Sequence, residues 1–284
     1  MERDVELADV RLRVEVSGPD DGPLALCLHG FPDTPFTFRF LRAALERRGY
    51  RVAAPWLRGY APSSTSSCEN YSLSALVDDA NALHDALGGD ERAVVIGHDW
   101  GAAIAYGACA RAPEKWRRAV AIAVPPSALF ASALFRFDQT RRSWYLWFFQ
   151  SPFAESVVAA NELEFLTRLW QSWSPGYDAT DDLARVRDAL ASDDALRAAL
   201  SYYRALFAPE RDGGALRDAT ARRPQVPTLY LHGADDGCVG VDVVAGVNDH
   251  LADGSRVVFL VDAGHFAHLE RPELVWREID AFLA

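Results

Sequence analysis

Short, largely apolar runs alternate with amphipathic segments along most of the chain. The runs of strand length are 24–28, 51–54, 93–96, 119–124, 226–231 and 256–261. The segments with helical character are 36–48, 73–87, the stretch that begins at 102, 242–251 and 272–283. Strands and helices that alternate in this way form a mostly parallel sheet flanked by helices, so we predict an α/β fold. At the start of the chain, residues 5–16 alternate between apolar and polar and predict an antiparallel hairpin.

The pattern changes between residues 127 and 218, where helical segments follow one another without a strand. This stretch carries four of the eight tryptophans, Trp144, Trp147, Trp170 and Trp173. The alternation of strands and helices resumes at residue 226. The sequence therefore predicts a core formed by residues 1–126 and 219–284, interrupted by a helical insertion at 127–218.

Composition narrows the classes of function. Half of the 284 residues are hydrophobic, which is enough for a sizeable core, and the formal net charge is -11. An acidic chain without a basic run is not typical of a nucleic-acid-binding protein. The four cysteines show no C-x-x-C pattern and indicate free thiols in a reducing compartment. The first residues lack a basic region followed by an apolar core, so we expect no signal peptide. No apolar run reaches membrane-spanning length, and we predict a cytoplasmic protein without a membrane partner.

One motif identifies a candidate catalytic residue. It is the run GHDWG at 97–101, which lies between an apolar strand and a stretch of helix formers. A strand, Gly-x-nucleophile-x-Gly and a helix together form the nucleophile elbow, a sharp turn that lifts one side chain above the edge of the sheet. Here that side chain is Asp99, at the position where many hydrolases carry serine. A carboxylate nucleophile suits attack on saturated carbon, as in epoxides and alkyl halides, and forms an ester of the enzyme's own side chain.

Five motifs follow one another in the order of a known family. They are HGFP at 29–32, RGYAPSS at 58–64, GHDWG at 97–101, GADD at 233–236 and GHF at 264–266. With them the chain resembles the α/β-hydrolases of the epoxide hydrolase and haloalkane dehalogenase branch, and it is most similar to the epoxide hydrolases. The resemblance covers nearly the whole chain. It implies the α/β-hydrolase fold, with the insertion at 127–218 as a cap over the site.

The resemblance also implies a catalytic triad around Asp99. His265 follows the last predicted strand, where an α/β-hydrolase carries its base, because the chain order runs nucleophile, acid, histidine. His268 is the competitor, and we assign it a structural role. Asp235 and Asp236 both follow the preceding strand, and either could be a turn residue. In the family the acid lies three residues beyond the glycine that ends the strand, which selects Asp236.

Backbone donors are expected beside Asp99. The run at 29–32 resembles the oxyanion loop of the family, so the N–H groups of Phe31 and Trp100 would point at the Asp99 oxygen that becomes negative during ester hydrolysis. A turn after a strand is also predicted there, and the two interpretations are compatible.

Two tyrosines of the cap are the predicted proton donors. Opening an epoxide develops negative charge on its oxygen, so an acid must face the nucleophile from the opposite side. Epoxide hydrolases use two cap tyrosines for this, and the runs at 144–152 and 201–204 resemble their motifs, placing Tyr145 and Tyr203. Either tyrosine could instead be simply packed in the core. The aromatic residues predicted to line the substrate pocket are Trp144, Trp147 and Phe149.

From these residues we predict an epoxide hydrolase, a hydrolase acting on ether bonds. It would open a small apolar epoxide to a vicinal diol through an alkyl ester on Asp99. The mechanism needs no metal and no organic cofactor. The chain is expected to be a monomer or a homodimer.

Two alternatives remain open. A haloalkane or haloacid dehalogenase would share the triad and would bind halide with the Trp100 indole and with Trp144 or Trp147. Phe31 weighs against it, because many dehalogenases carry a polar side chain at that position. A receptor of the same fold that binds a small ligand without catalysis is the third class, and turnover of any epoxide would exclude it.

Overall fold

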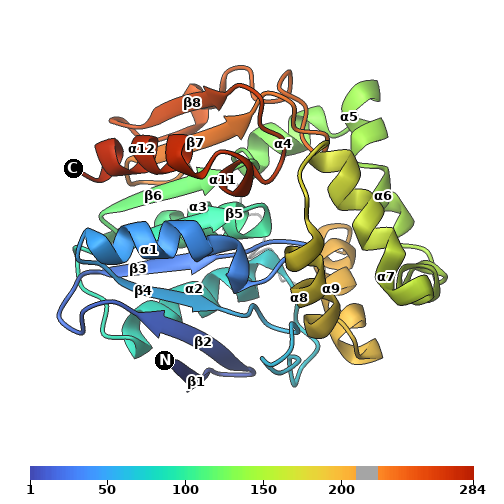
Figure 1. Ribbon diagram of the computed structural model, residues 1–284, viewed down its shortest axis with the longest axis horizontal. Helices are drawn as coiled ribbons and strands as arrows, with labels where there is room; N and C mark the ends of the chain where they lie inside the picture. Colours follow the sequence, from blue (N-terminus) through green and yellow to red (C-terminus); the bar gives the residue numbers. More distant parts are fainter. Residues whose placement is uncertain (209–222) are drawn as a thin grey trace.

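The computed structural model describes residues 1–208 and 223–284, and within them an eight-stranded sheet forms the centre of the molecule (Figure 1). The strands follow the spatial order β1-β2-β4-β3-β5-β6-β7-β8. Their bounds are Glu2–Glu6 (β1), Arg11–Ser17 (β2), Leu24–Leu28 (β3), Arg51–Pro55 (β4), Val94–His98 (β5), Arg118–Ile122 (β6), Thr228–Gly233 (β7) and Arg256–Leu260 (β8). The β1–β2 and β2–β4 pairs are antiparallel, and the other pairs are parallel. The predicted mostly parallel sheet with an initial hairpin is confirmed.

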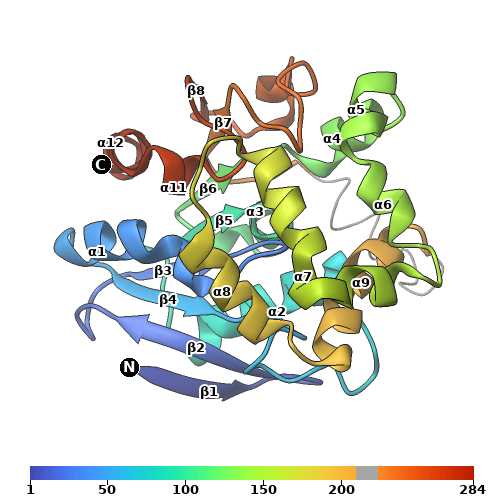
Figure 2. The same cartoon turned by 45° about the vertical axis from the view of Figure 1, so that its right-hand side comes forward.

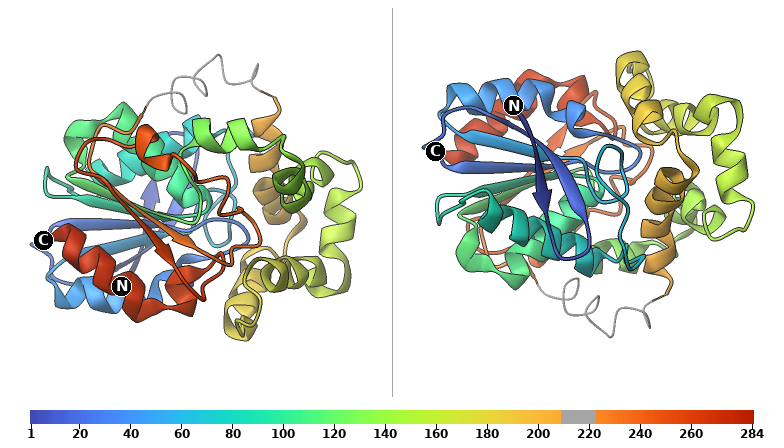
Figure 3. Two further views of the ribbon diagram at one scale, coloured as in Figure 1. Left: turned by 90° about the horizontal axis from the view of Figure 1, so that it is seen from above. Right: turned by 90° about the horizontal axis from the view of Figure 1, so that it is seen from below.

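Helices cover both faces of this sheet (Figure 3). One face carries α1 (Arg39–Arg47) and α12 (Pro272–Leu283), and the other carries α2 (Leu73–Ala86) and α3 (Trp100–Arg111). Leu45 of α1 and Ile279 of α12 are fully buried in one apolar cluster, whereas Leu76 of α2 and Ile104 of α3 belong to a second. The sheet therefore separates two apolar layers. The shorter elements of the core are η1 (Pro35–Phe38), η2 (Pro113–Lys115), η4 (Val247–His250) and α11 (Ala267–Glu270).

Two elements differ from the prediction. Segment 242–251 is predicted to be helical, but the structure has turns there and only the short 3₁₀ helix η4. Gly246 interrupts the helix, because its backbone takes the left-handed conformation with a φ of 80°. The strand predicted at 119–124 ends at Ile122, since Ala123 takes a φ of 72°. Apolar periodicity does not detect such changes of backbone direction.

Helices α4 to α9 follow β6 and lie across the carboxyl ends of the parallel strands (Figure 2). Their bounds are Ser127–Ala133 (α4), Phe137–Arg142 (α5), Trp144–Phe148 (α6), Ala154–Trp173 (α7), Thr180–Ala189 (α8) and Asp193–Leu206 (α9). No strand interrupts residues 127–208, and α7 is kinked at 160–163. The predicted end of the insertion, Asp218, lies outside the described residues, and the division into core and cap stays a prediction.

None of the helices within residues 1–208 and 223–284 has the length and apolar character needed to cross a membrane.

Candidate active site

Asp99 occupies the turn between β5 and α3. Its φ of 54° and ψ of -116° are strained for a residue other than glycine, at a cost of about 1–3 kcal/mol. The flanking glycines make the turn possible. A Cβ on Gly97 would overlap the Gly101 carbonyl, and a Cβ on Gly101 would overlap the Leu28 carbonyl. The turn thus holds the Asp99 carboxylate, in a residue only 5 % exposed, at the carboxyl end of β5.

His265 and Asp236 approach Asp99 from two other loops. Asp236 follows β7 and His265 follows β8, so both loops start at the same edge of the sheet as Asp99. His265 Nδ1 is 2.9 Å from Asp236 Oδ2, and His265 Nε2 is 3.5 Å from Asp99 Oδ2. All three side chains are buried. The structure therefore brings together the residues predicted as nucleophile, base and acid, with the histidine between the two carboxylates.

The two neighbouring aspartates of the GADD run point in different directions. Asp236 is buried against His265, whereas Asp235 is exposed. The second carboxylate oxygen of Asp236 accepts the N–H groups of Cys238 at 2.7 Å and Val239 at 2.9 Å. These two hydrogen bonds fix the carboxylate in the orientation that meets the imidazole.

Burial and charge act on the triad in opposite directions. Burial alone would lower the pKa of His265, but the charge and hydrogen bond of Asp236, together with Asp99, raise this pKa to about 10. Burial would raise the pKa of Asp236, but the charge of His265 and their hydrogen bond hold this pKa below its ordinary value. The His265 imidazole is therefore protonated at neutral pH.

A backbone donor reaches Asp99 from the loop after β3. The N–H of Phe31 donates to Asp99 Oδ1 at 2.7 Å. Trp100 is the first residue of α3, so its N–H has no partner within the helix. The predicted contact of Phe31 is present, and the role of the Trp100 N–H stays a prediction.

Tyr145 and Tyr203 reach the same space from two helices of the insertion. Tyr145 belongs to α6 and Tyr203 to α9, and their ring centroids are 5.6 Å apart. Burial raises the pKa of both hydroxyls well above its ordinary value, so both are protonated. The Tyr145 hydroxyl is 3.3 Å from Cys238 Sγ. Within residues 1–208 and 223–284 the buried Tyr203 hydroxyl meets no hydrogen-bond partner in normal geometry, which leaves it available to a ligand.

Asp99, Tyr145 and Tyr203 line one cavity of about 270 Å³. Most of the remaining wall is apolar and consists of Leu73, Trp100, Ala103, Val124, Phe130, Ala131, Leu134, Leu146, Leu206, Phe207 and Val239. A cavity of this size and composition suits a small apolar molecule with one polar group that meets the carboxylate and the hydroxyls.

Trp144 and Trp147 lie outside the pocket in which they are predicted. They are 47 % and 38 % exposed, and neither lines the cavity. Tyr145 in α6 and Phe149, the residue that caps the carboxyl end of this helix, are four residues apart and both buried, and this turns both indoles outward. Phe149 also does not line the cavity, because it is fully buried behind Tyr203, at 5.1 Å between ring centroids. The structure thus differs from the prediction for these three residues.

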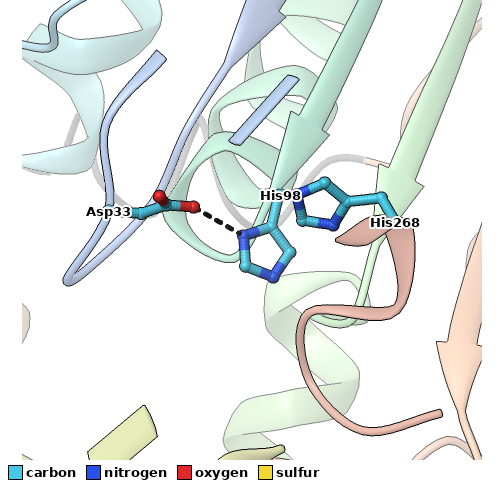
Figure 4. Close-up of side chains that lie close together, drawn as sticks. All are labelled: Asp33, His98 and His268. Carbon is cyan, nitrogen blue, oxygen red and sulfur yellow. Dashed lines mark ion pairs between the residues drawn. The ribbon is translucent and has the colours of Figure 1, made fainter. Parts of the chain in front are cut away.

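The side chains of Asp33, His98 and His268 form a second buried polar group (Figure 4), and the ring centroids of His98 and His265 are 4.9 Å apart. Asp33, His98 and His268 offer three possible metal ligands within 4.8 Å of one another. His98 Nδ1 is 3.7 Å from Asp33 Oδ2, and His98 Nε2 donates to the His265 carbonyl at 3.0 Å. His268 Nε2 is 2.6 Å from Thr37 Oγ1. These contacts tie β5 to the loop that carries His265, in keeping with the structural role predicted for His268.

Cys238 is a polar cavity residue that sequence reasoning missed. With Asp236 and His265 it forms another group of three possible metal ligands within 4.8 Å, two of which already bond to each other in the triad. The one sequence signal for Cys238 is its place two residues after Asp236. Its contact with Tyr145 joins positions 93 apart, which no local pattern predicts.

Comparisons with known proteins point to one family. A family model described as alpha/beta hydrolase fold matches residues 23–272. The AB hydrolase superfamily protein YfhM of Bacillus subtilis is 31% identical, over 94% of this chain and 92% of that protein. Epoxide hydrolase 4 of Homo sapiens is 29% identical, over 96% of this chain and 76% of that protein. A solved structure among epoxide hydrolases from metagenomes of hot environments has a TM-score of 0.85 and 27% identity, and the match covers 100% of this chain and 98% of that chain.

Proposed function

The chain belongs to the α/β-hydrolase fold family, and we propose that it opens a small apolar epoxide to a vicinal diol through an ester on Asp99. Its similarity to epoxide hydrolases confirms the family, the fold and the enzyme class predicted from the sequence, a hydrolase acting on ether bonds. One observation supports the ester mechanism above all. The Asp99 carboxylate stands at the nucleophile elbow and shares a cavity with the hydroxyls of Tyr145 and Tyr203.

In the first half-reaction an oxygen of Asp99 attacks an epoxide carbon while Tyr145 and Tyr203 hydrogen-bond the ring oxygen. The C–O bond of the ring breaks, a C–O bond to Asp99 forms, and a tyrosine proton moves to the alkoxide. The product of this step is a hydroxyalkyl ester. Esterification removes the negative charge of Asp99, one of the causes that raise the pKa of His265. That pKa therefore falls, and the imidazolium can return a proton to the tyrosinate.

In the second half-reaction neutral His265 takes a proton from a water molecule, whose oxygen attacks the Asp99 carboxyl carbon. The N–H groups of Phe31 and Trp100 stabilise the tetrahedral oxyanion. Asp236 keeps the imidazole oriented and stabilises its positive charge. Collapse of the tetrahedral intermediate breaks the ester C–O bond, and the new carboxyl group of Asp99 passes its proton to the departing alkoxide. Release of the diol then leaves the Asp99 carboxylate and the imidazolium of the resting enzyme. These side chains supply nucleophile, base and acid, so the proposed mechanism uses no metal or organic cofactor.

The structure gives less support to the dehalogenase alternative. A departing halide needs two polar donors, for which the sequence offered the Trp100 indole and an indole of the insertion. Trp100 lines the cavity, but Trp144 and Trp147 are turned toward solvent. The groups that face the Asp99 carboxylate across the cavity include two tyrosine hydroxyls, which suit an epoxide oxygen.

A side-by-side assay tests the proposed function. The protein is incubated with styrene oxide and, separately, with a primary bromoalkane, while diol and bromide are quantified. Diol without bromide is the expected result. Bromide without diol would establish the dehalogenase, and neither product from a panel of epoxides and haloalkanes would favour a ligand-binding receptor.

The two neighbouring aspartates give a matched pair of variants. Asp236→Asn is expected to slow turnover on the order of 10³- to 10⁴-fold, because the amide no longer stabilises the His265 imidazolium. Asp235→Asn should stay within about threefold of the unmodified enzyme, since this carboxylate is exposed. Steady-state kinetics on styrene oxide measures the turnover rates of both variants. The reverse ranking would mean that Asp235 carries the catalytic charge.

The pH dependence of ester breakdown follows from His265. The base must be neutral, so breakdown is expected to speed up as the pH rises, with an apparent pKa below the value of about 10 for the resting enzyme. Single-turnover measurements between about pH 5 and pH 9 would resolve ester formation from ester breakdown. A breakdown rate that falls as the pH rises would contradict the role of His265 as the base.

A further inference from the structure

The thiol of Cys238 contacts a hydroxyl to which the proposed mechanism assigns a proton transfer. Cys238 is 2 % exposed and lines the cavity together with Asp99 and Tyr145. Its Sγ is 3.3 Å from the Tyr145 hydroxyl oxygen, within hydrogen-bond distance for sulfur, and either atom can be the donor. The mechanism gives this thiol no bond to form or break, so its contact with Tyr145 needs another explanation.

The backbone of Cys238 is held from two sides. Its N–H donates to Asp236 Oδ1 at 2.7 Å, and its carbonyl accepts the side-chain amide of Gln139 at 2.9 Å. Gln139 lies on α5, is 1 % exposed, and also accepts the N–H of Gly240 at 3.0 Å. Cys238 is therefore fixed relative both to the acid of the triad and to α5, the helix that directly precedes the one that carries Tyr145.

The direction of the hydrogen bond decides its effect. A phenol has one proton to donate, and in an epoxide hydrolase that proton must point at the ring oxygen. The contact between Tyr145 and Cys238 leaves this proton free only if the thiol is the donor. We propose that the Cys238 S–H donates to the Tyr145 oxygen and makes Cys238 a positioning residue for epoxide opening. This inference rests on the proposed function.

Two consequences follow for the first half-reaction. The S–H donor turns the Tyr145 proton toward the cavity, and it stabilises the negative charge that builds on the phenol oxygen as the proton leaves. The thiol also stays protonated, because burial and the charges of Asp236 and Asp99 raise its pKa well above the ordinary value. A protonated thiol does not compete with the Asp99 carboxylate for the epoxide carbon.

Single-turnover alkylation by styrene oxide tests the inference. Cys238→Ala is expected to slow formation of the Asp99 ester about threefold to thirtyfold, the scale of one hydrogen bond, with little change in KM. Cys238→Ser keeps a donor and should recover most of the rate. Cys109→Ala is the matched control, because Cys109 is also a buried cysteine but does not line the cavity. It should alkylate at the unmodified rate.

A double-mutant cycle separates positioning from packing. In the Tyr145→Phe background the further change Cys238→Ala should have no effect on alkylation, because the acceptor of the thiol is gone. An equal loss with and without the Tyr145 hydroxyl would assign Cys238 to packing alone and overturn the inference. Alkylation by Cys238→Ala at the unmodified rate would overturn it as well.

Infrared spectroscopy reads the hydrogen bond without any turnover. The S–H band of Cys238 is identified as the band that the change Cys238→Ala removes from the spectrum. Its frequency should be lower in the unmodified protein than in the Tyr145→Phe protein, where the thiol has no phenol oxygen to which it can donate. Absence of this shift would show that the thiol is not the donor. If the unmodified protein opens no epoxide, the proposed function fails, while the infrared result still decides the direction of the hydrogen bond.

Discussion

Replacing His265 by glutamine is expected to leave ester formation intact and to stop ester breakdown. Asp99 and the two tyrosine hydroxyls carry out the first half-reaction, whereas only the second needs a base to activate water. Turnover should fall by on the order of 10⁴-fold or more. Mass spectrometry after incubation with styrene oxide should find the protein heavier by one substrate molecule, with the added mass on Asp99.

Two controls make this result specific. Asp99→Ala, alone or combined with His265→Gln, should give no adduct, since the nucleophile is missing. In the unmodified enzyme, turnover in water labelled with heavy oxygen should place label in the Asp99 carboxylate. Label that enters the diol in a single turnover and never the carboxylate would exclude the ester and indicate direct attack by water.

The sequence predicts the elbow and the triad because their signals are local. Gly97 and Gly101 are required by the carbonyls that lie against them, and the same two glycines mark the turn in the sequence. Asp235 and Asp236 both follow β7, and the resemblance to the family selects Asp236, while His265 lies after β8, where the family carries its base. Residues that must follow the ends of parallel strands meet at one edge of the sheet, so short motifs specify a site assembled from distant parts of the chain.

The insertion is less predictable, because its side chains are oriented by packing between helices. The run at 144–152 identifies Tyr145 but does not say which face of α6 turns inward. An aromatic residue on either face fits the sequence, and in the structure Trp144 and Trp147 take the outer one. The contact of Tyr145 with Cys238 depends on how this helix packs on the turn after β7. Such contacts are tertiary and leave no periodic signal.

The double change Tyr145→Phe and Tyr203→Phe is expected nearly to abolish epoxide opening. Each single change removes one hydroxyl and should slow alkylation roughly tenfold to thousandfold, the scale on which one acid or oxyanion donor acts. With both hydroxyls gone, the developing alkoxide loses both of the donors that the proposed mechanism assigns to it. Both aromatic rings are kept, with their contacts to each other and to Phe149, so the melting temperature should change little.

The same variants separate the two reactions that share the triad. A dehalogenase would tolerate the loss of both hydroxyls, because halide leaves without a proton, whereas Trp100→Phe would remove an indole donor and slow halide release. In an epoxide hydrolase the order of effects is reversed, and Trp100→Phe keeps the backbone N–H that the oxyanion needs. The four variants are the two single tyrosine changes, the double change and Trp100→Phe. Rapid-quench measurement of ester formation and steady-state measurement of diol formation rank them by rate. Diol formation at the unmodified rate by the double tyrosine variant would contradict the proposed mechanism, which assigns protonation of the ring oxygen to these two hydroxyls.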